Sequence, residues 1–286
     1  MDKIGIGTIL FLFILNCTFE GKTEIFNPQY NPKISVFGVI STDESQEFVI
    51  VERTLQLNED DDTDEYGSVD PIIDDAVVQI MCDQDTIQFT FYKKEMDSLY
   101  SPEKYLYKGM YIDRYNEFRA QAGQKYTLQV RVPDGRTVTG TTSVPNYPTI
   151  NRPGTNEILK KQTIKETTIN WVDDENTIAY LVEFYVTIIE DEYSYFNYNM
   201  HNILDDYLVY HSPATLKEID LSFLYTSVIQ LSDTATIKIL ALDHKLYDYA
   251  TKSSMASLTG TDLNLLEGGV GVFGSISVDS VNVILE

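Results

Sequence analysis

Residues 122–145, AGQKYTLQVRVPDGRTVTGTTSVP, carry the clearest fold signal in the chain. From Tyr126 to Val132, large apolar residues alternate with polar ones, which is typical of a β-strand with one buried face. The turn residues Pro133-Asp134-Gly135 follow, and a second run begins after them. This stretch therefore predicts a β-hairpin over residues 124–144.

The same two-residue alternation recurs elsewhere and predicts a mainly β protein. It is clearest in three runs: KISVFGVI (33–40), YLVEFYVTI (180–188) and ATIKILAL (235–242). Alternating strands with turn residues between them favour antiparallel β-sandwiches over a parallel sheet.

A proline-rich junction near Val144–Pro148 suggests a boundary between two such sandwiches. We expect an immunoglobulin- or transthyretin-like sandwich over residues 33–145 and a fibronectin-III-like sandwich over 146–286. In the second, the single tryptophan, Trp171, is interpreted as a core anchor rather than a ligand platform.

One or two short helices are expected in the second sandwich. The stretch Asp243 to Leu258 has apolar residues at helical spacing, and Asp243 is a suitable N-cap. Asn199 to Val209 is a weaker helical candidate.

Composition limits the classes of partner. The chain has 286 residues, of which 43% are hydrophobic, so it can form a packed core. Lys and Arg total 21 against 44 Asp and Glu, which gives a net charge of −23. This sign repels phosphate backbones and argues against nucleic-acid binding.

The N-terminus predicts export and a lipid anchor. An uncharged apolar run from Ile4 to Leu15 matches the core of a signal peptide and is too short to span a bilayer. The residues before Cys17 resemble a lipobox, although Asn16 departs from it; the alternative is an ordinary signal peptide cleaved a few residues later. Residues 18–32 are interpreted as a flexible linker between this anchor and the body.

The other cysteine, Cys82, has no partner if Cys17 is acylated, so no disulfide is expected. It shares a strand face with Ala76, Val78 and Ile80. We interpret it as a small buried hydrophobic residue rather than a reactive thiol.

The acidic loop at residues 59–65 is a weak calcium candidate. Asp60, Asp62 and Asp64 have the spacing of the first EF-hand ligands, but Glu65 and Pro71 break the pattern. A solvated loop is the preferred interpretation, and no metal is expected.

The glycine-rich stretch at residues 269–274 matches G-x-G-x-x-G without the context of a nucleotide site. The residues after Gly274 have the pattern of a strand, whereas a dinucleotide site requires a helix there. We expect these glycines to allow close backbone approach or positive φ in a last hairpin.

No catalytic constellation is evident, so the chain is predicted not to be an enzyme and to need no cofactor. The histidines His201, His211 and His244 form no metal-ligand motif, and no nucleophile motif is present. The adjacent carboxylates at 173–174 and 205–206 are expected by chance in so acidic a chain. A hydrolase with an unrecognised carboxylate pair is kept as a third hypothesis.

Aromatic residues gather after an acidic stretch: Tyr193, Tyr195, Phe196 and Tyr198. Exposed aromatic rings can stack on sugars or contact a protein partner. The alternative is that they pack on the sandwich.

Several segments occur in one order: Cys17, KISVFGVIS, DDAVVQI at 74–80, residues 122–145, INWVDDEN, LYDY at 246–249 and GGVGVFGS at 268–275. This order resembles the domain-of-unknown-function family 4249, envelope lipoproteins typical of Bacteroidota and often encoded beside TonB-dependent receptors. The resemblance implies a lipid-anchored outer-membrane protein, on either membrane face, and no catalytic residues.

The favoured functional hypothesis is a non-catalytic accessory or substrate-binding partner of a TonB-dependent receptor in nutrient uptake. A small nutrient, a peptide or a glycan would be the ligand. The alternative is a structural or adhesive envelope module that binds a surface glycan or protein through the aromatic residues at 193–198.

Overall fold

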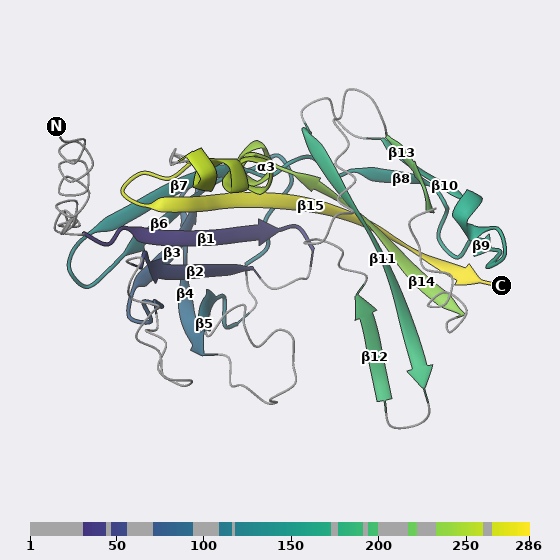
Figure 1. Cartoon of the computed structure of the whole chain (residues 1–286), viewed down its shortest axis with the longest axis horizontal. Helices are drawn as coiled ribbons and strands as arrows, with labels where there is room; N and C mark the ends of the chain where they lie inside the picture. Colours follow the sequence, from purple (N-terminus) through teal and green to yellow (C-terminus); the bar gives the residue numbers. More distant parts are fainter. Residues whose placement is uncertain are drawn as a thin grey trace, which may run out of the picture. The chain divides into compact units, whose positions relative to one another are not determined.

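A computed structural model describes residues 31–43, 47–55, 71–93, 109–115, 118–172, 177–190, 194–199, 217–221, 233–259 and 265–286. Residues Lys33–Glu286 form one compact unit, which is mainly β as the sequence predicts. Figure 1 shows its strands and the helix α3.

The described strands form a large sheet and a small one. The large sheet has the order β12-β11-β14-β15-β1-β2-β5-β4-β3-β6-β7, with β9 pairing beside β15, and the small sheet has the order β13-β10-β8. The bounds in the large sheet are β1 (Ile34–Ser41), β2 (Phe48–Arg53), β3 (Val77–Cys82), β4 (Asp85–Lys93), β5 (Gly109–Ile112), β6 (Lys125–Arg131), β7 (Thr137–Ser143), β9 (Ile158–Leu159), β11 (Ala179–Glu190), β12 (Ser194–Asn199), β14 (Thr234–Leu242) and β15 (Val270–Leu285). The small sheet contains β8 (Thr149–Arg152), β10 (Thr168–Val172) and β13 (Glu218–Asp220), and a 3₁₀ turn, η2 (Ile164–Glu166), precedes β10.

The predicted hairpin is confirmed as β6 and β7. The two strands pair antiparallel from Lys125 opposite Ser143 to Arg131 opposite Thr137. Gly135 has a φ of +90° in the turn between them. This left-handed conformation costs a glycine little, which explains its place in the turn.

The expected last hairpin is wrong, because Val270–Leu285 is one continuous strand of 16 residues. This strand, β15, pairs parallel with β1 and antiparallel with β14, so the large sheet is mixed rather than wholly antiparallel. Of the glycines in the 269–274 stretch, Gly271 has a positive φ, as expected, and so does Gly268 just before the stretch. They accommodate neighbouring backbone and do not reverse the chain.

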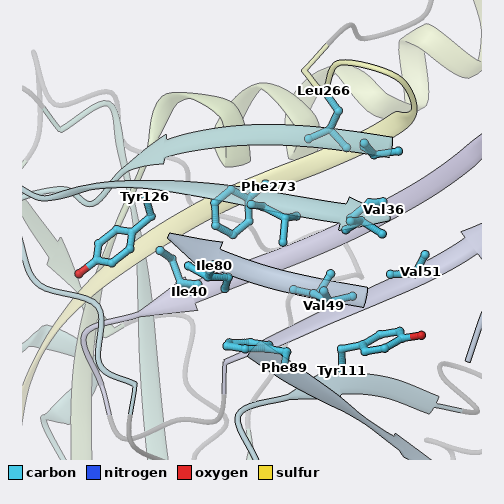
Figure 2. Packing of buried hydrophobic residues seen from close by; sticks show 14 of the residues in the cluster. Val36, Ile40, Val49, Val51, Ile80, Phe89, Tyr111, Tyr126, Leu266 and Phe273 are labelled. Atoms are coloured by element: carbon cyan, nitrogen blue, oxygen red, sulfur yellow. The ribbon is translucent and has the colours of Figure 1, made fainter. Parts of the chain in front are cut away.

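The first hydrophobic core lies where the large sheet folds over itself, so that β1, β2 and β15 face β3, β6 and β7 (Figure 2). Phe273 of β15 lies inside this core and is fully buried. The face predicted for β3 is also confirmed, since Val78 and Ile80 are buried. Cys82 is half-buried at the edge of the core, so it is less enclosed than expected.

The second core lies between the small sheet and one face of β11, β14 and β15. All four alternate apolar residues predicted for the 235–242 run are buried in it. Trp171 is 1% exposed and meets Tyr180 edge-on, with ring centroids 5.2 Å apart. Its predicted role as a core anchor is confirmed.

The two cores share the strand β15. Apart from Leu266 and Phe273, the residues of the first core end at Val144, and those around the second begin at Ile150. The strand β15 supplies Phe273 to the first core and Val283 to the second. Figure 1 shows β15 running from the neighbourhood of β1 to that of β14. The last strand, β15, therefore connects the two hydrophobic cores within one compact unit.

The predicted helix is confirmed as α3 (His244–Thr259), which packs against β15. Asp243 is its N-cap, since its Oδ1 accepts a hydrogen bond from the Leu246 backbone N–H at 2.8 Å. The weaker candidate at 199–209 falls outside the described residues except for Asn199, which ends β12. In the described part of the chain, no helix is long and apolar enough to cross a membrane.

Candidate functional site

Most of the residues predicted to have a functional role lie outside the described part of the chain. These are the lipidation candidate Cys17, the weak calcium candidates Asp60, Asp62 and Asp64, and the aromatic residue Tyr193. Their assigned roles stay predictions.

The other aromatic candidates lie on β12. Its backbone pairs antiparallel with β11, so that Tyr195 is opposite Ile189, Phe196 opposite Ile188 and Tyr198 opposite Val186. Among the described strands, β12 is at the end of the large sheet. The aromatic stretch is thus a strand of the main sheet, and its position at the sheet end is compatible with either hypothesis for it.

The histidine described in the structure forms part of a local helix network. The Nδ1 atom of His244 lies 3.0 Å from Asp248 Oδ2, and Lys252 Nζ contacts the other carboxylate oxygen. His201 and His211 fall outside the described residues. Across the residues that the structure describes, no group of three or more His, Cys, Asp and Glu side chains could hold a metal ion.

A buried polar junction connects β7, β15 and the start of α3. Thr142 Oγ1 donates a hydrogen bond to Asp243 Oδ2 at 2.6 Å and lies 2.6 Å from Ser275 Oγ. The Asp243 backbone N–H also bonds to the Ser275 carbonyl. Because the other Asp243 oxygen caps α3, both carboxylate oxygens are occupied by internal partners.

This junction holds the helix on the sheet. Lys245 adds a charged contact, since its Nζ donates to the Thr141 carbonyl at 2.5 Å. Burial raises the pKa of Asp243, and its hydrogen bonds, led by that from Thr142, act in the opposite direction. The group is thus enclosed and fully bonded, so we assign it a structural role.

The second buried carboxyl group is Glu47, directly before β2. Its side chain is 2% exposed, and its Oε1 has no hydrogen-bond partner among the described residues. Burial raises the pKa of Glu47 to about 7, opposed in part by the Arg119 guanidinium. The neutral form of the Glu47 carboxyl group is therefore favoured in the folded state.

The neighbourhood of Glu47 contains a second buried acid, Asp113. Its Oδ2 accepts a hydrogen bond from the Phe118 backbone N–H at 2.6 Å, and Oδ1 accepts one from Tyr115 at 3.2 Å. Asp113 therefore shapes the loop after β5. Sequence reasoning missed both acids because one charged residue beside an apolar run gives no sign of burial.

These features define a class: an acidic, mainly β protein with two cores, in which Glu47, Asp113, Glu183 and Asp243 are buried carboxyl groups. The chain belongs to the Domain of unknown function (DUF4249) family, whose model matches residues 22–281.

No curated protein matches the chain. A solved structure titled "Protocadherin gammaB7 EC3-6 cis-dimer structure" is 9% identical, with a TM-score of 0.23. The alignment covers 90% of this chain and 51% of that one, so the chain spans about half the length of this neighbour.

Proposed function

We propose that the protein is a non-catalytic outer-membrane lipoprotein, anchored through Cys17, that serves as an accessory partner of a TonB-dependent receptor in nutrient uptake. The observation that carries this proposal is the lipobox-like Cys17, followed by a linker over residues 18–32. The compact unit begins at Lys33, directly after this linker.

The anchor provides membrane association without a transmembrane segment. Each methylene group of an acyl chain buried in the bilayer contributes about 0.8 kcal/mol, so two or more chains hold a protein stably on a membrane. The linker would let the body reach a neighbouring membrane protein while it stays attached. The chain belongs to the DUF4249 family. The sequence resembles the envelope lipoproteins of that family, and this resemblance supports the proposal.

The anchor is tested by metabolic labelling with an alkyne analogue of palmitate, comparing the wild type with Cys17→Ala. We expect label in the wild type and its loss in the variant, together with release of the variant from the outer-membrane fraction. Equal labelling of the two proteins would refute acylation at Cys17. Cys82→Ala is the matched control and should keep the full label.

The partnership is tested by purifying the tagged full chain in mild detergent and identifying stoichiometric partners by mass spectrometry. Recovery of a TonB-dependent receptor is the expected result, and its repeated absence would refute the partnership. Retention on a glycan column that is lost in Tyr195→Ala would instead favour the adhesive alternative.

The charge of the chain adds a second test. A complex formed through the net charge of −23 should weaken as salt rises. The Debye length falls from about 10 Å at 0.1 M salt to about 3 Å at 1 M. A complex that is insensitive to this change would point to an apolar interface instead.

A further inference from the structure

The outward face of β4, β3, β6 and β7 is chemically unlike the rest of this chain. The core-facing residues of these strands include Phe89, Ile80, Leu128 and Val138, all buried. Because side chains alternate along a strand, the residues between them lie on the opposite face. We call this opposite side the amide face; its positions are Thr86, Gln88, Thr90, Tyr92, Val77, Gln79, Met81, Lys125, Thr127, Gln129, Arg131, Thr137, Thr139, Thr141 and Ser143.

None of the fifteen positions of the amide face is Asp or Glu, in a chain with 44 such residues; the nearest carboxylate is that of Glu267, which pairs with Thr139 at the β7 edge. Its charged members, Lys125 and Arg131, are cationic and lie at opposite ends of β6. Asp85, the acidic residue of β4, is aligned with Cys82 and so belongs to the core side. An even spread of the 44 acidic residues over 286 positions would place about two on these fifteen, so the face is depleted in negative charge.

Glutamine side chains from three neighbouring strands line up across the centre of this face. Gln88 is opposite Gln79, Gln79 is opposite Gln129, and Gln129 is opposite Thr139. Strands lie about 4.8 Å apart, so the row extends for about 14 Å. Thr139 closes one end of the row, where its Oγ1 lies 3.5 Å from Glu267 Oε2.

The three amides have unused hydrogen-bonding capacity. None of Gln79, Gln88 and Gln129 forms a side-chain hydrogen bond with another residue in the described ranges. Each amide offers two donors and an acceptor. On the same face Tyr92 is 52% exposed, which leaves an aromatic ring near the β4 end.

We infer that the amide face binds a neutral glycan chain. A sugar hydroxyl both donates and accepts hydrogen bonds, as an amide does, and the exposed Tyr92 ring can stack on a sugar. A row that crosses four neighbouring strands fits an extended chain. The net charge of −23 repels anionic polysaccharides, whereas a neutral chain meets no such barrier.

A protein partner fits this surface less well. The cores of protein interfaces are enriched in aromatic residues, Met and Arg, and are apolar where they are fully buried. The row across the amide face consists of three glutamines and Thr139, which would leave many polar groups to be satisfied on burial, although Val77 and Met81 flank Gln79. A neutral glycan would be the ligand that the protein holds in its proposed accessory role. The binding itself does not depend on that role, and only the passage of the glycan to a receptor rests on the proposed function.

The test is native gel electrophoresis of the full chain in gels that contain dextran, glucomannan, xyloglucan or, as the anionic probe, polygalacturonate. We expect at least one neutral polysaccharide to retard the wild type. The triple variant Gln79→Ala/Gln88→Ala/Gln129→Ala should bind at least 10-fold more weakly. Gln162→Ala, which removes an exposed glutamine amide from the turn before η2, is the matched control and should bind as the wild type does.

A second variant keeps the test independent of folding defects. Gln79→Glu replaces the two amide donors at the centre of the row by a carboxylate that only accepts hydrogen bonds, so it should weaken binding several-fold with an unchanged circular dichroism spectrum. Three outcomes would overturn the inference: no retardation by any neutral polysaccharide, binding of polygalacturonate alone, or equal binding by the wild type and the triple variant. Self-association of the wild type that the triple variant abolishes would also overturn it, since the face would then join two copies.

The electrophoresis contains no receptor, so its result is independent of the partnership. Retardation without recovery of a receptor would refute the accessory role and leave the glycan site in place. Recovery of a receptor without retardation by any neutral polysaccharide would refute the glycan site and leave the accessory role in place.

Discussion

Replacing Gly271 by alanine should destabilise the protein far more than an ordinary glycine substitution. Gly271 lies in β15 opposite Val36 of β1 and has a φ of +110°. A Cβ atom there would overlap the Val36 carbonyl oxygen and lie 2.9 Å from the Val36 carbonyl carbon. The variant therefore combines backbone strain with a collision between two central strands.

The size of the effect follows from these two contributions. Holding a residue other than glycine in such a conformation costs about 1–3 kcal/mol. Moving β15 away from β1 to remove the overlap weakens about two ladder hydrogen bonds, at about 1 kcal/mol each. The sum is about 3–5 kcal/mol, a large part of the ~5–15 kcal/mol that stabilises a typical domain.

Two glycines provide matched controls. Gly135 has a φ of +90°, but a Cβ there would meet nothing within 4 Å, so Gly135→Ala measures backbone strain alone. At Gly154 a Cβ would have Glu157 Oε2 at an ordinary contact distance of 3.9 Å. Gly154→Ala should therefore change the stability by less than about 1 kcal/mol.

The measurement is urea unfolding followed by far-ultraviolet circular dichroism and by the fluorescence of Trp171. We expect the free energy of unfolding to decrease in the order Gly154→Ala, Gly135→Ala, Gly271→Ala. If Gly271→Ala proves no more costly than Gly135→Ala, the collision with β1 is refuted as the reason for this glycine.

Substitutions at three further residues test the second core and two of the buried acids. Glu47 has a pKa of about 7 in the folded state against an ordinary value of 4.5, so between these values the folded state binds more protons, and the free energy of unfolding falls as pH rises. Glu47→Gln should flatten this fall in urea titrations at pH 4.5, 6 and 8. An unchanged dependence of stability on pH would contradict the assignment. Trp171→Ala should lower the free energy of unfolding by about 3–5 kcal/mol, because it leaves a cavity against Tyr180. Trp171→Phe should lower it by less than about 2 kcal/mol, because the indole N–H has no partner among the described residues. Equal losses of stability in thermal unfolding of the two variants would argue against cavity formation. Asp243→Ala should lower the free energy of unfolding by about 2–4 kcal/mol, since it removes the cap of α3 and leaves the buried Thr142 hydroxyl without its acceptor. Backbone amide hydrogen exchange should rise first at the start of α3. Unchanged exchange at that position would contradict this reasoning.

The sequence alone determined the local features of the fold. The alternation in residues 124–144 and 235–242 identified strands and their buried faces, because a strand places every second side chain on one side. The N-cap Asp243 and the helix after it were predicted from neighbouring residues, since capping involves positions three residues apart. Trp171 was correctly placed in a core from its position in an apolar strand.

Pairing between distant segments could be decided only by the tertiary structure. The sequence pattern of residues 270–285 is that of a strand whether it pairs with a hairpin partner or with β1, which lies more than 200 residues earlier in the chain. Alternation specifies which side chains are buried and leaves the neighbouring strand unspecified. The expected last hairpin was wrong for this reason, and the positive φ of Gly271 relates to the carbonyl of Val36 rather than to a turn.

The candidate sites show the same division. The lipidation candidate Cys17 and the aromatic residues at 193–198 are contiguous motifs, and a sequence displays these directly. The buried state of Glu47 and the row of Gln88, Gln79 and Gln129 depend on strand register. A shift of one residue in that register would turn the row toward the core, so its existence follows from the pairing of β3 with β4 and β6.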